Sequence, residues 1–169
     1  MPYCHDYLPQ HQRKWRATST CVCYHPFLIA FLSVQGYQGP QTRMDSQQKD
    51  HLYEKGLEAF NSSHFYDAHE HWEEVWLETP NPDKKFLQGL IQVAAAFHHY
   101  SRANLAGTRN LLRAGLLKLD CFPEVHGGLE IDALREAVRG WLDDLDAGEI
   151  PKTRKPPRIA RHPTHKHTL

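Results

Sequence analysis

The segment FLQGLIQVAAAF, residues 86–97, constrains the fold of this chain more than any other stretch. Its residues are apolar almost all round a helical wheel, and a helix of that kind must be covered by other elements on most of its faces. As a helix the segment is too short to cross a bilayer, which needs about 20 apolar residues. The pattern therefore predicts the central helix of a soluble bundle.

Helical periodicity runs along the whole chain from Met44 and is interrupted only by turn residues. The first three predicted helices cover about residues 46–61, 65–77 and 84–101, a fourth carries the leucines of residues 111–119, and a fifth begins near Asp132. The segment NSSH (61–64) predicts a turn with Ser62 or Ser63 as a helix N-cap, and TPNPD (79–83) ends the second helix because proline cannot continue it. The expected fold is all-α: a compact bundle of about five helices built from helical hairpins, with disordered termini.

A weak internal repeat supports the hairpins. The pattern has a weak echo 39 residues further on. Five residues fall at offsets similar to those of a tetratricopeptide repeat: Gly56, Phe65, Ala68, Trp72 and Pro80. An array of such repeats normally needs three or more copies. The pattern therefore indicates a weakly tetratricopeptide-like bundle of two packed hairpins.

Composition divides the chain into three regions. Residues 44–149 form the predicted helical bundle domain, and residues 45–149 hold 10 Lys/Arg against 19 Asp/Glu, a net charge of −9. Residues 150–169 hold six basic and no acidic residues and are rich in proline, which predicts a basic disordered tail. Residues 1–43 show no periodicity, which fits either a disordered leader or a mis-called extension ahead of a natural start at Met44.

The same features narrow the class of protein. The few cysteines have no disulfide or zinc-ribbon spacing, which favours a reducing, cytoplasmic setting. The apolar run at residues 26–34 is too short for a membrane span and lacks a signal-peptide cleavage site. An acidic body makes nucleic-acid binding by the bundle unfavourable, although the basic tail can make weak, salt-sensitive contacts. A homo-oligomer is compatible with the sequence.

A polar cluster is predicted on the second and third helices. The stretch HFYDAHEHWEEVWLETP, residues 64–80, opens like the zinc-protease signature H-E-x-x-H, but Glu73 stands where the second histidine belongs. On a helix His69 and Glu73 share a face, as do Glu70 and Glu74. If the two helices are neighbours, these residues converge with the polar residues of the third helix, which are Gln88, Gln92 and His99.

Two chemistries and one structural role fit this cluster. Imidazole and carboxylate bind divalent metals, and a second carboxylate can act as base on a bound water, so His69, Glu73 and His99 are candidate metal ligands. Glutamine is a poor transition-metal ligand, which weighs against a metal. Buried amides also need hydrogen-bond partners, so the cluster can equally be a structural polar network. Phe65, Trp72 and Trp76 are expected in the core, and the remaining glutamates on the solvated face.

The runs FNSSHFYDAHEHWEEVW and FLQGLIQVAAAFHHYSRANLAGTRNLL resemble the family known as domain of unknown function 309. The resemblance spans about residues 52–145 and implies a compact α-helical bundle with no established reaction. The family's signature polar residues fall on His69, Glu70, Glu73, Gln88, Gln92 and His99. Asn104 and Gly107 match its turn, whereas Ala103 and Thr108 replace the usual glycine and alanine.

Three functions are therefore open at this point. The favoured one is a ligand- or peptide-binding or adaptor module with a polar His/Glu/Gln groove. The first alternative is a metal-assisted or acid–base hydrolase that uses His69 with Glu70 or Glu73. The second alternative is a structural polar cluster with no active site.

Overall fold

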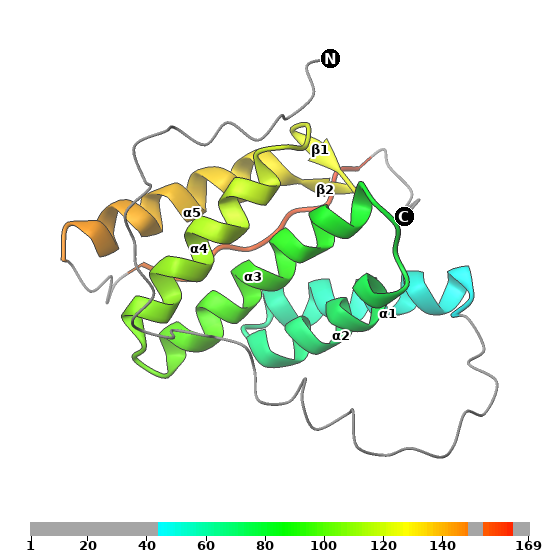
Figure 1. Ribbon diagram of the computed structural model, residues 1–169, viewed down its shortest axis with the longest axis horizontal. Coiled ribbons are helices and arrows are strands. Elements are labelled where there is room, and N and C mark those ends of the chain that lie inside the picture. The colour runs from blue at the N-terminus through cyan, green and yellow to red at the C-terminus, as the bar shows by residue number, and fades with distance from the viewer. Residues whose placement is uncertain (1–43, 149–153, 164–169) are drawn as a thin grey trace, which may run out of the picture. The chain divides into compact units, whose positions relative to one another are not determined.

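The computed structural model describes residues 44–148 and 154–163. Five helices account for most of this part of the chain: α1 (Ser46–Asn61), α2 (Phe65–Leu77), α3 (Asp83–Ser101), α4 (Leu105–Leu119) and α5 (Ile131–Asp146) (Figure 1). The all-α fold is thus confirmed, and each helix lies where the periodicity predicts it. Within the described residues, no helix combines the length and hydropathy needed to cross a membrane. The predictions for residues 1–43 lie outside the described residues.

A short β-hairpin was not predicted. β1 (Val125–His126) and β2 (Leu129–Glu130) pair antiparallel between the fourth and fifth helices, with Val125 opposite Glu130 and His126 opposite Leu129. Gly127 and Gly128 form the turn between them with φ of 56° and 72°, a backbone region that favours glycine.

Side-chain hydrogen bonds cap the starts of α1 and α4, but the cap predicted for α2 is wrong. Asp45 caps α1 in a capping box with Gln48, and the Asn104 side chain accepts a hydrogen bond from the Gly107 backbone at the start of α4. The prediction that Ser62 or Ser63 caps α2 is wrong, because the N-cap position is His64 and its side chain makes no capping hydrogen bond. Ser63 instead takes a positive φ of 65°, which turns the chain between α1 and α2.

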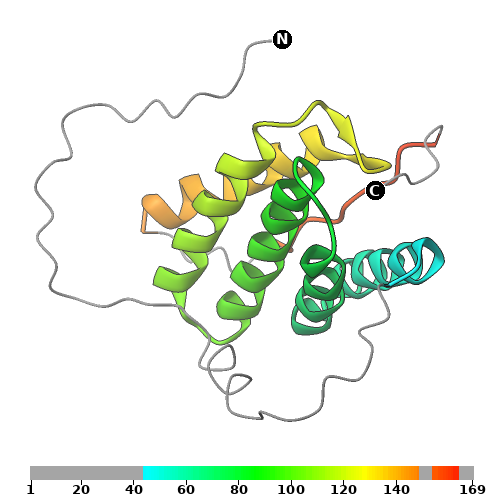
Figure 2. The same ribbon diagram turned by 45° about the vertical axis from the view of Figure 1, so that its right-hand side comes forward.

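α3 lies between α2 and α4, with α1 packed on α2 and α5 on α4 (Figures 1 and 2). The predicted central helix is confirmed, since eight residues of α3 are buried. Phe97 has its ring centroid 6.2 Å from Phe60 of α1, 5.4 Å from Phe65 of α2 and 5.2 Å from Trp141 of α5. Trp72 is fully buried as expected, whereas Trp76 is only half-buried. One aromatic cluster therefore joins four helices.

The basic segment after α5 departs from its prediction. Residues 154–163, expected to belong to a disordered tail, lie against α5, α1 and β2, and Ile159 is only 3% exposed. The physical reason is that backbone hydrogen bonds to other elements hold the segment, and such contacts leave no periodic pattern in the sequence.

Candidate functional site

The outer surface of α2 carries a compact group of three ionisable side chains. His69 Nδ1 lies 3.1 Å from Glu70 Oε1 and 3.9 Å from Glu73 Oε2. The His69 side chain is 14% exposed, while those of Glu70 and Glu73 are 48% and 37% exposed. Helical geometry explains the grouping, because residues one turn apart share a face and adjacent Glu70 can reach across to the same imidazole. We call these three residues the α2 cluster.

The α2 cluster contains the donor types of a divalent-metal site. One atom from each of its residues lies within 4.8 Å of the other two, and the cluster is the one such grouping found in the described part of the chain. An imidazole nitrogen and carboxylate oxygens suit zinc or manganese. A cation held here by two or by all three of these side chains would keep open positions toward solvent.

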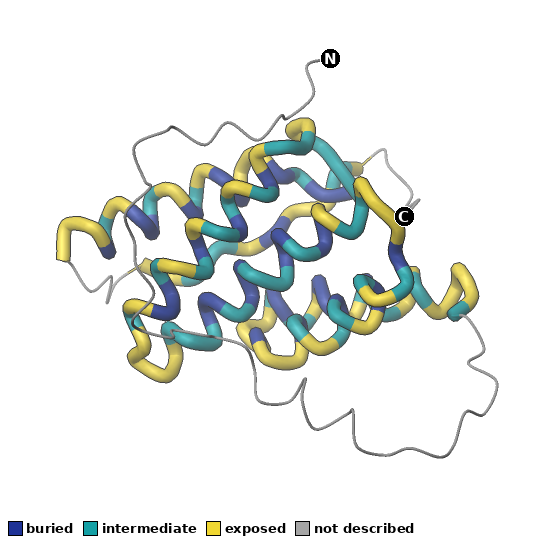
Figure 3. Tube along the Cα trace, viewed as in Figure 1, coloured by how far each residue is buried: buried dark blue, intermediate teal, exposed yellow. Residues whose placement is uncertain are grey.

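α3 is the neighbour of α2, which is the condition for the expected convergence, but it does not complete the cluster in the expected way. Gln88 and Gln92 lie on a half-buried stripe of α3 that recurs at three- and four-residue spacing (Figure 3). Gln92 Oε1 is buried and has no hydrogen-bond partner. A polar network between the helices is therefore not formed through that atom.

His99 lies at the C-terminal end of α3, beside the turn to α4. Its Nδ1 is 3.0 Å from Asn104 Nδ2, at the turn between α3 and α4. It is not a member of the group of possible metal ligands on α2. The proposal of His99 as a third metal ligand therefore finds no support in the geometry.

Two aromatic residues extend the cluster and were missed from the sequence. Tyr66 is 46% exposed, its ring is stacked on His69 at 6.5 Å with an interplanar angle of 19°, and it lies 5.5 Å from His98 of α3. The available signal was spacing, since Tyr66 precedes His69 by three residues on the same helix. Through Tyr66 and His98 the α2 cluster makes contact with α3.

Comparison with known proteins relates this region to one family. Residues 53–111 match the family model described as Domain of unknown function (DUF309). Over these residues the chain is similar to the DUF309 family. The match runs from α1 into α4 and includes all six polar residues that the resemblance assigned, although it is shorter than the expected span of residues 52–145.

Two relatives extend this comparison. An "Uncharacterized protein" of Aquifex aeolicus (strain VF5) is 30% identical over 102 residues, which cover 60% of this chain and 31% of the relative. The "Uncharacterized protein YpuF" of Bacillus subtilis (strain 168) is 39% identical over 49 residues, 28% of this chain and 28% of the relative. The chain thus spans about a third of the length of these relatives. The similarity to DUF309 concerns residues 53–111 of this chain.

Proposed function

We propose that this helical domain is a binding module that receives a positively charged group of a ligand or peptide at the α2 cluster. The observation that carries the proposal is the placement of Glu70 and Glu73 around the His69 imidazole, beside the exposed ring of Tyr66. Two carboxylates can accept hydrogen bonds from an ammonium or guanidinium group, and a tyrosine face attracts the same charge.

The surroundings favour a cationic ligand. Residues 45–149 carry a net charge of −9, which attracts cations over a distance comparable to the Debye length. Both carboxylates are more than a third exposed, so a ligand can reach them without opening the bundle. The same exposure weighs against a purely structural role, which would bury these groups between helices.

Native mass spectrometry of protein purified without an affinity tag tests this proposal. We expect the wild type to retain a ligand mass that a Glu70→Gln/Glu73→Gln double variant loses. Glu74→Gln is the matched control, because Glu74 is exposed on the same helix but outside the cluster. A retained mass that survives in the double variant, or no retained mass in any of the three proteins, would contradict the proposal.

A metal-assisted hydrolase is the second candidate, and the three donor atoms within 4.8 Å favour it. His69 and Glu73 would hold a divalent cation, and Glu70 would remain to take a proton from a metal-bound water. Elemental analysis after incubation with Zn²⁺ or Mn²⁺ and desalting separates the two functions. We expect about one metal per chain, reduced by His69→Ala; a much lower content that His69→Ala leaves unchanged would remove this candidate.

We also propose a cellular compartment for the protein. We place it in the cytoplasm, because four cysteines without disulfide spacing fit a reducing compartment. Cell fractionation with an antibody against the natural protein checks the compartment.

A further inference from the structure

Residues 154–163, which we call the strap, cross the surface of the bundle as a strand-like segment. The strap passes from α5 to α1 and ends beside β2 (Figure 1). Its contacts fall into three groups: a side-chain clamp on its backbone, backbone pairing with β2, and side-chain contacts with acidic and apolar residues. Each group is a recognised means of binding a peptide.

The clamp is Asn61, at the last position of α1. Its Oδ1 accepts a hydrogen bond from the Ile159 backbone N–H at 2.8 Å, and its Nδ2 donates to the Ile159 carbonyl at 3.0 Å. One side-chain amide thus satisfies both backbone groups of a single residue. Such a clamp recognises an extended backbone whatever side chain that residue carries.

Backbone pairing continues the contact beyond the clamp. The Glu130 N–H donates to the Ala160 carbonyl at 2.9 Å, and the His162 N–H donates to the Gly128 carbonyl at 3.0 Å. Leu129 and Arg161 form the corresponding antiparallel bridge. The strap therefore pairs with β2 through one antiparallel bridge, the kind of backbone contact that peptides make in β-augmentation.

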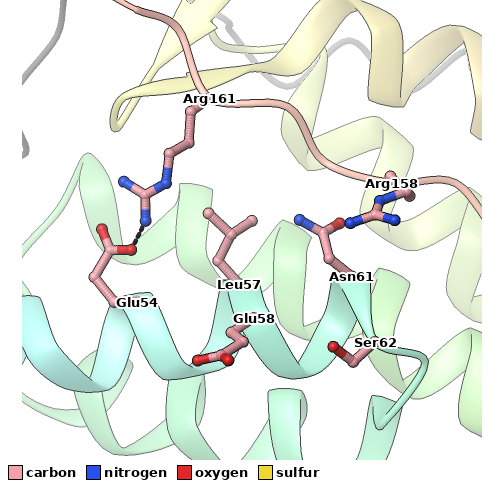
Figure 4. Close-up of a pocket in the computed structure, with 7 residues that line it drawn as sticks. All are labelled: Glu54, Leu57, Glu58, Asn61, Ser62, Arg158 and Arg161. Carbon is pink, nitrogen blue, oxygen red and sulfur yellow. Dashed lines mark ion pairs between the residues drawn. The ribbon is translucent and has the colours of Figure 1, made fainter.

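Side chains supply the sequence preference. Ile159 is 3% exposed and belongs to the hydrophobic core, while Arg161 pairs with Glu54 of α1 and Arg154 Nε lies 2.6 Å from Asp144 Oδ2 of α5. Arg158 and Arg161 also line a pocket of about 340 Å³ with Glu54, Leu57, Glu58 and Asn61 of α1 and with Ser62 directly after it (Figure 4). An acidic surface with one apolar position matches a basic segment with one aliphatic residue.

We infer that the surface between α1, β2 and α5 is a peptide-binding groove for an extended basic segment in which an aliphatic residue precedes an arginine by two positions. The strap occupies this groove within its own chain, with Ile159 and Arg161 at the two key positions. From another protein, the groove would bind a basic peptide of the same pattern. Such a peptide can make the same backbone contacts and the same ion pairs with the acidic side chains of the groove. The groove uses no residue of the α2 cluster, so it stands independently of the function proposed for that cluster.

The test converts the strap into a separate peptide while every part of the chain is kept. A protease recognition sequence is inserted between residues 150 and 151 of the full chain, and cleavage is confirmed by mass. The probe is a fluorescein-labelled synthetic peptide of residues 154–163, added to the cleaved protein and followed by anisotropy. We expect saturable binding that unlabelled peptide reverses.

Matched variants identify the contacts responsible. Asn61→Ala in the cleaved protein is expected to weaken the probe's affinity by about tenfold, because two hydrogen bonds are lost. Asn110→Ala, which changes an exposed asparagine of α4, should bind as the unsubstituted protein does. With the unsubstituted protein, probes carrying Ile159→Asp or Arg161→Glu should bind at least about tenfold more weakly, since they place a charge in the core or against Glu54.

Three results would overturn the inference. The first is an absence of probe binding although far-ultraviolet circular dichroism shows the cleaved protein as helical as before. The second is loss of helix content on cleavage, which would make the strap an integral part of the core. The third is probe binding that Asn61→Ala, Ile159→Asp and Arg161→Glu all leave as strong as in the Asn110→Ala control, which would indicate a contact without sequence preference.

Discussion

At the scale of single residues, Tyr53 shows how burial couples the fold to pH. Its side chain is 1% exposed, and its hydroxyl donates to the Gly127 carbonyl at 2.9 Å. Burial is the largest cause that raises the pKa of this phenol far above its ordinary value; Arg161 acts in the opposite direction and Asp83 adds to the rise. The folded protein therefore holds the Tyr53 proton in a pH range where the unfolded chain releases it.

This difference predicts alkaline destabilisation. Below the ordinary pKa of 10.0 both states are protonated and Tyr53 gives no pH dependence, whereas above it the unfolded state binds fewer protons and the free energy of unfolding falls as pH rises. Tyr53→Phe removes this contribution, so its unfolding free energy should fall less between pH 9.5 and about pH 11. At pH 7 the variant should be less stable by about 1 kcal/mol, because the hydrogen bond to Gly127 is lost.

Urea titrations at several pH values measure both effects. Tyr66→Phe is the control, since Tyr66 is 46% exposed and is not a member of the hydrophobic core. If Tyr53→Phe kept the wild-type slope above pH 10, the buried phenol would not be the source of the pH dependence.

How far the candidate site could be predicted from the sequence depended on whether the residues concerned lie on one helix or on different helices. His69, Glu70 and Glu73 share one helix, so helical spacing alone predicted their proximity. His99 belongs to another helix, and its pairing with Asn104 depends on the turn after α3, which spacing does not specify. Tyr66 was missed because an aromatic residue on an amphipathic helix is first assigned to the core.

At the scale of elements, the α1–α2 contact depends on one glycine. A Cβ at Gly56 would lie 2.4 Å from Trp72 Nε1 and 2.5 Å from Trp72 Cδ1. Trp72 cannot move aside easily, since it is fully buried and its Nε1 donates to the Tyr53 carbonyl at 3.1 Å. The glycine therefore allows the two helices to pack closely around a fixed indole.

Gly56→Ala should consequently destabilise the protein although alanine is the better helix former. Alanine contributes about 1 kcal/mol in helix propensity, but overpacking against a fixed indole costs about 1–3 kcal/mol and also strains the indole hydrogen bond. We expect a net loss of about 1 kcal/mol or more in the free energy of unfolding, measured by urea titration.

Gly140→Ala is the matched control in α5. There the added Cβ would approach the Arg154 Nη1 atom at 2.8 Å, which is the far end of a flexible and exposed side chain. This variant should be neutral or slightly stabilising. Equal destabilisation by both substitutions would show that close packing on Trp72 is not what Gly56 provides.

The elements also show which parts of the fold a sequence pattern can predict. The helices were predictable because apolar spacing, capping residues and prolines are local signals. The strap was not, because Ile159 is a single apolar residue among prolines and basic residues, and its order comes from Asn61 and β2, far away in the sequence. The β1–β2 hairpin is two residues long on each side, too short for alternation to be recognised.

At the scale of the whole described body, Phe97 makes the helices a single cooperative unit. Its ring is fully buried and contacts the rings of Phe60, Phe65 and Trp141, which belong to α1, α2 and α5. Phe97 itself lies on α3, so removing it loosens four helices at once. A loss that is shared by four elements should lower the stability of all of them together.

Phe97→Ala should therefore lower the free energy of unfolding by about 3–5 kcal/mol, as expected for a large aromatic removed from a core that cannot collapse around the cavity. Far-ultraviolet circular dichroism and tryptophan fluorescence should still give one coincident transition, because Trp72 and Trp141 both report on the same cluster. Leu117→Ala, which truncates a side chain that is 72% exposed, should change the free energy of unfolding by less than about 0.5 kcal/mol. Separate transitions for the two probes in Phe97→Ala would mean that α5 unfolds independently of α1 and α2, and that the aromatic cluster does not couple them.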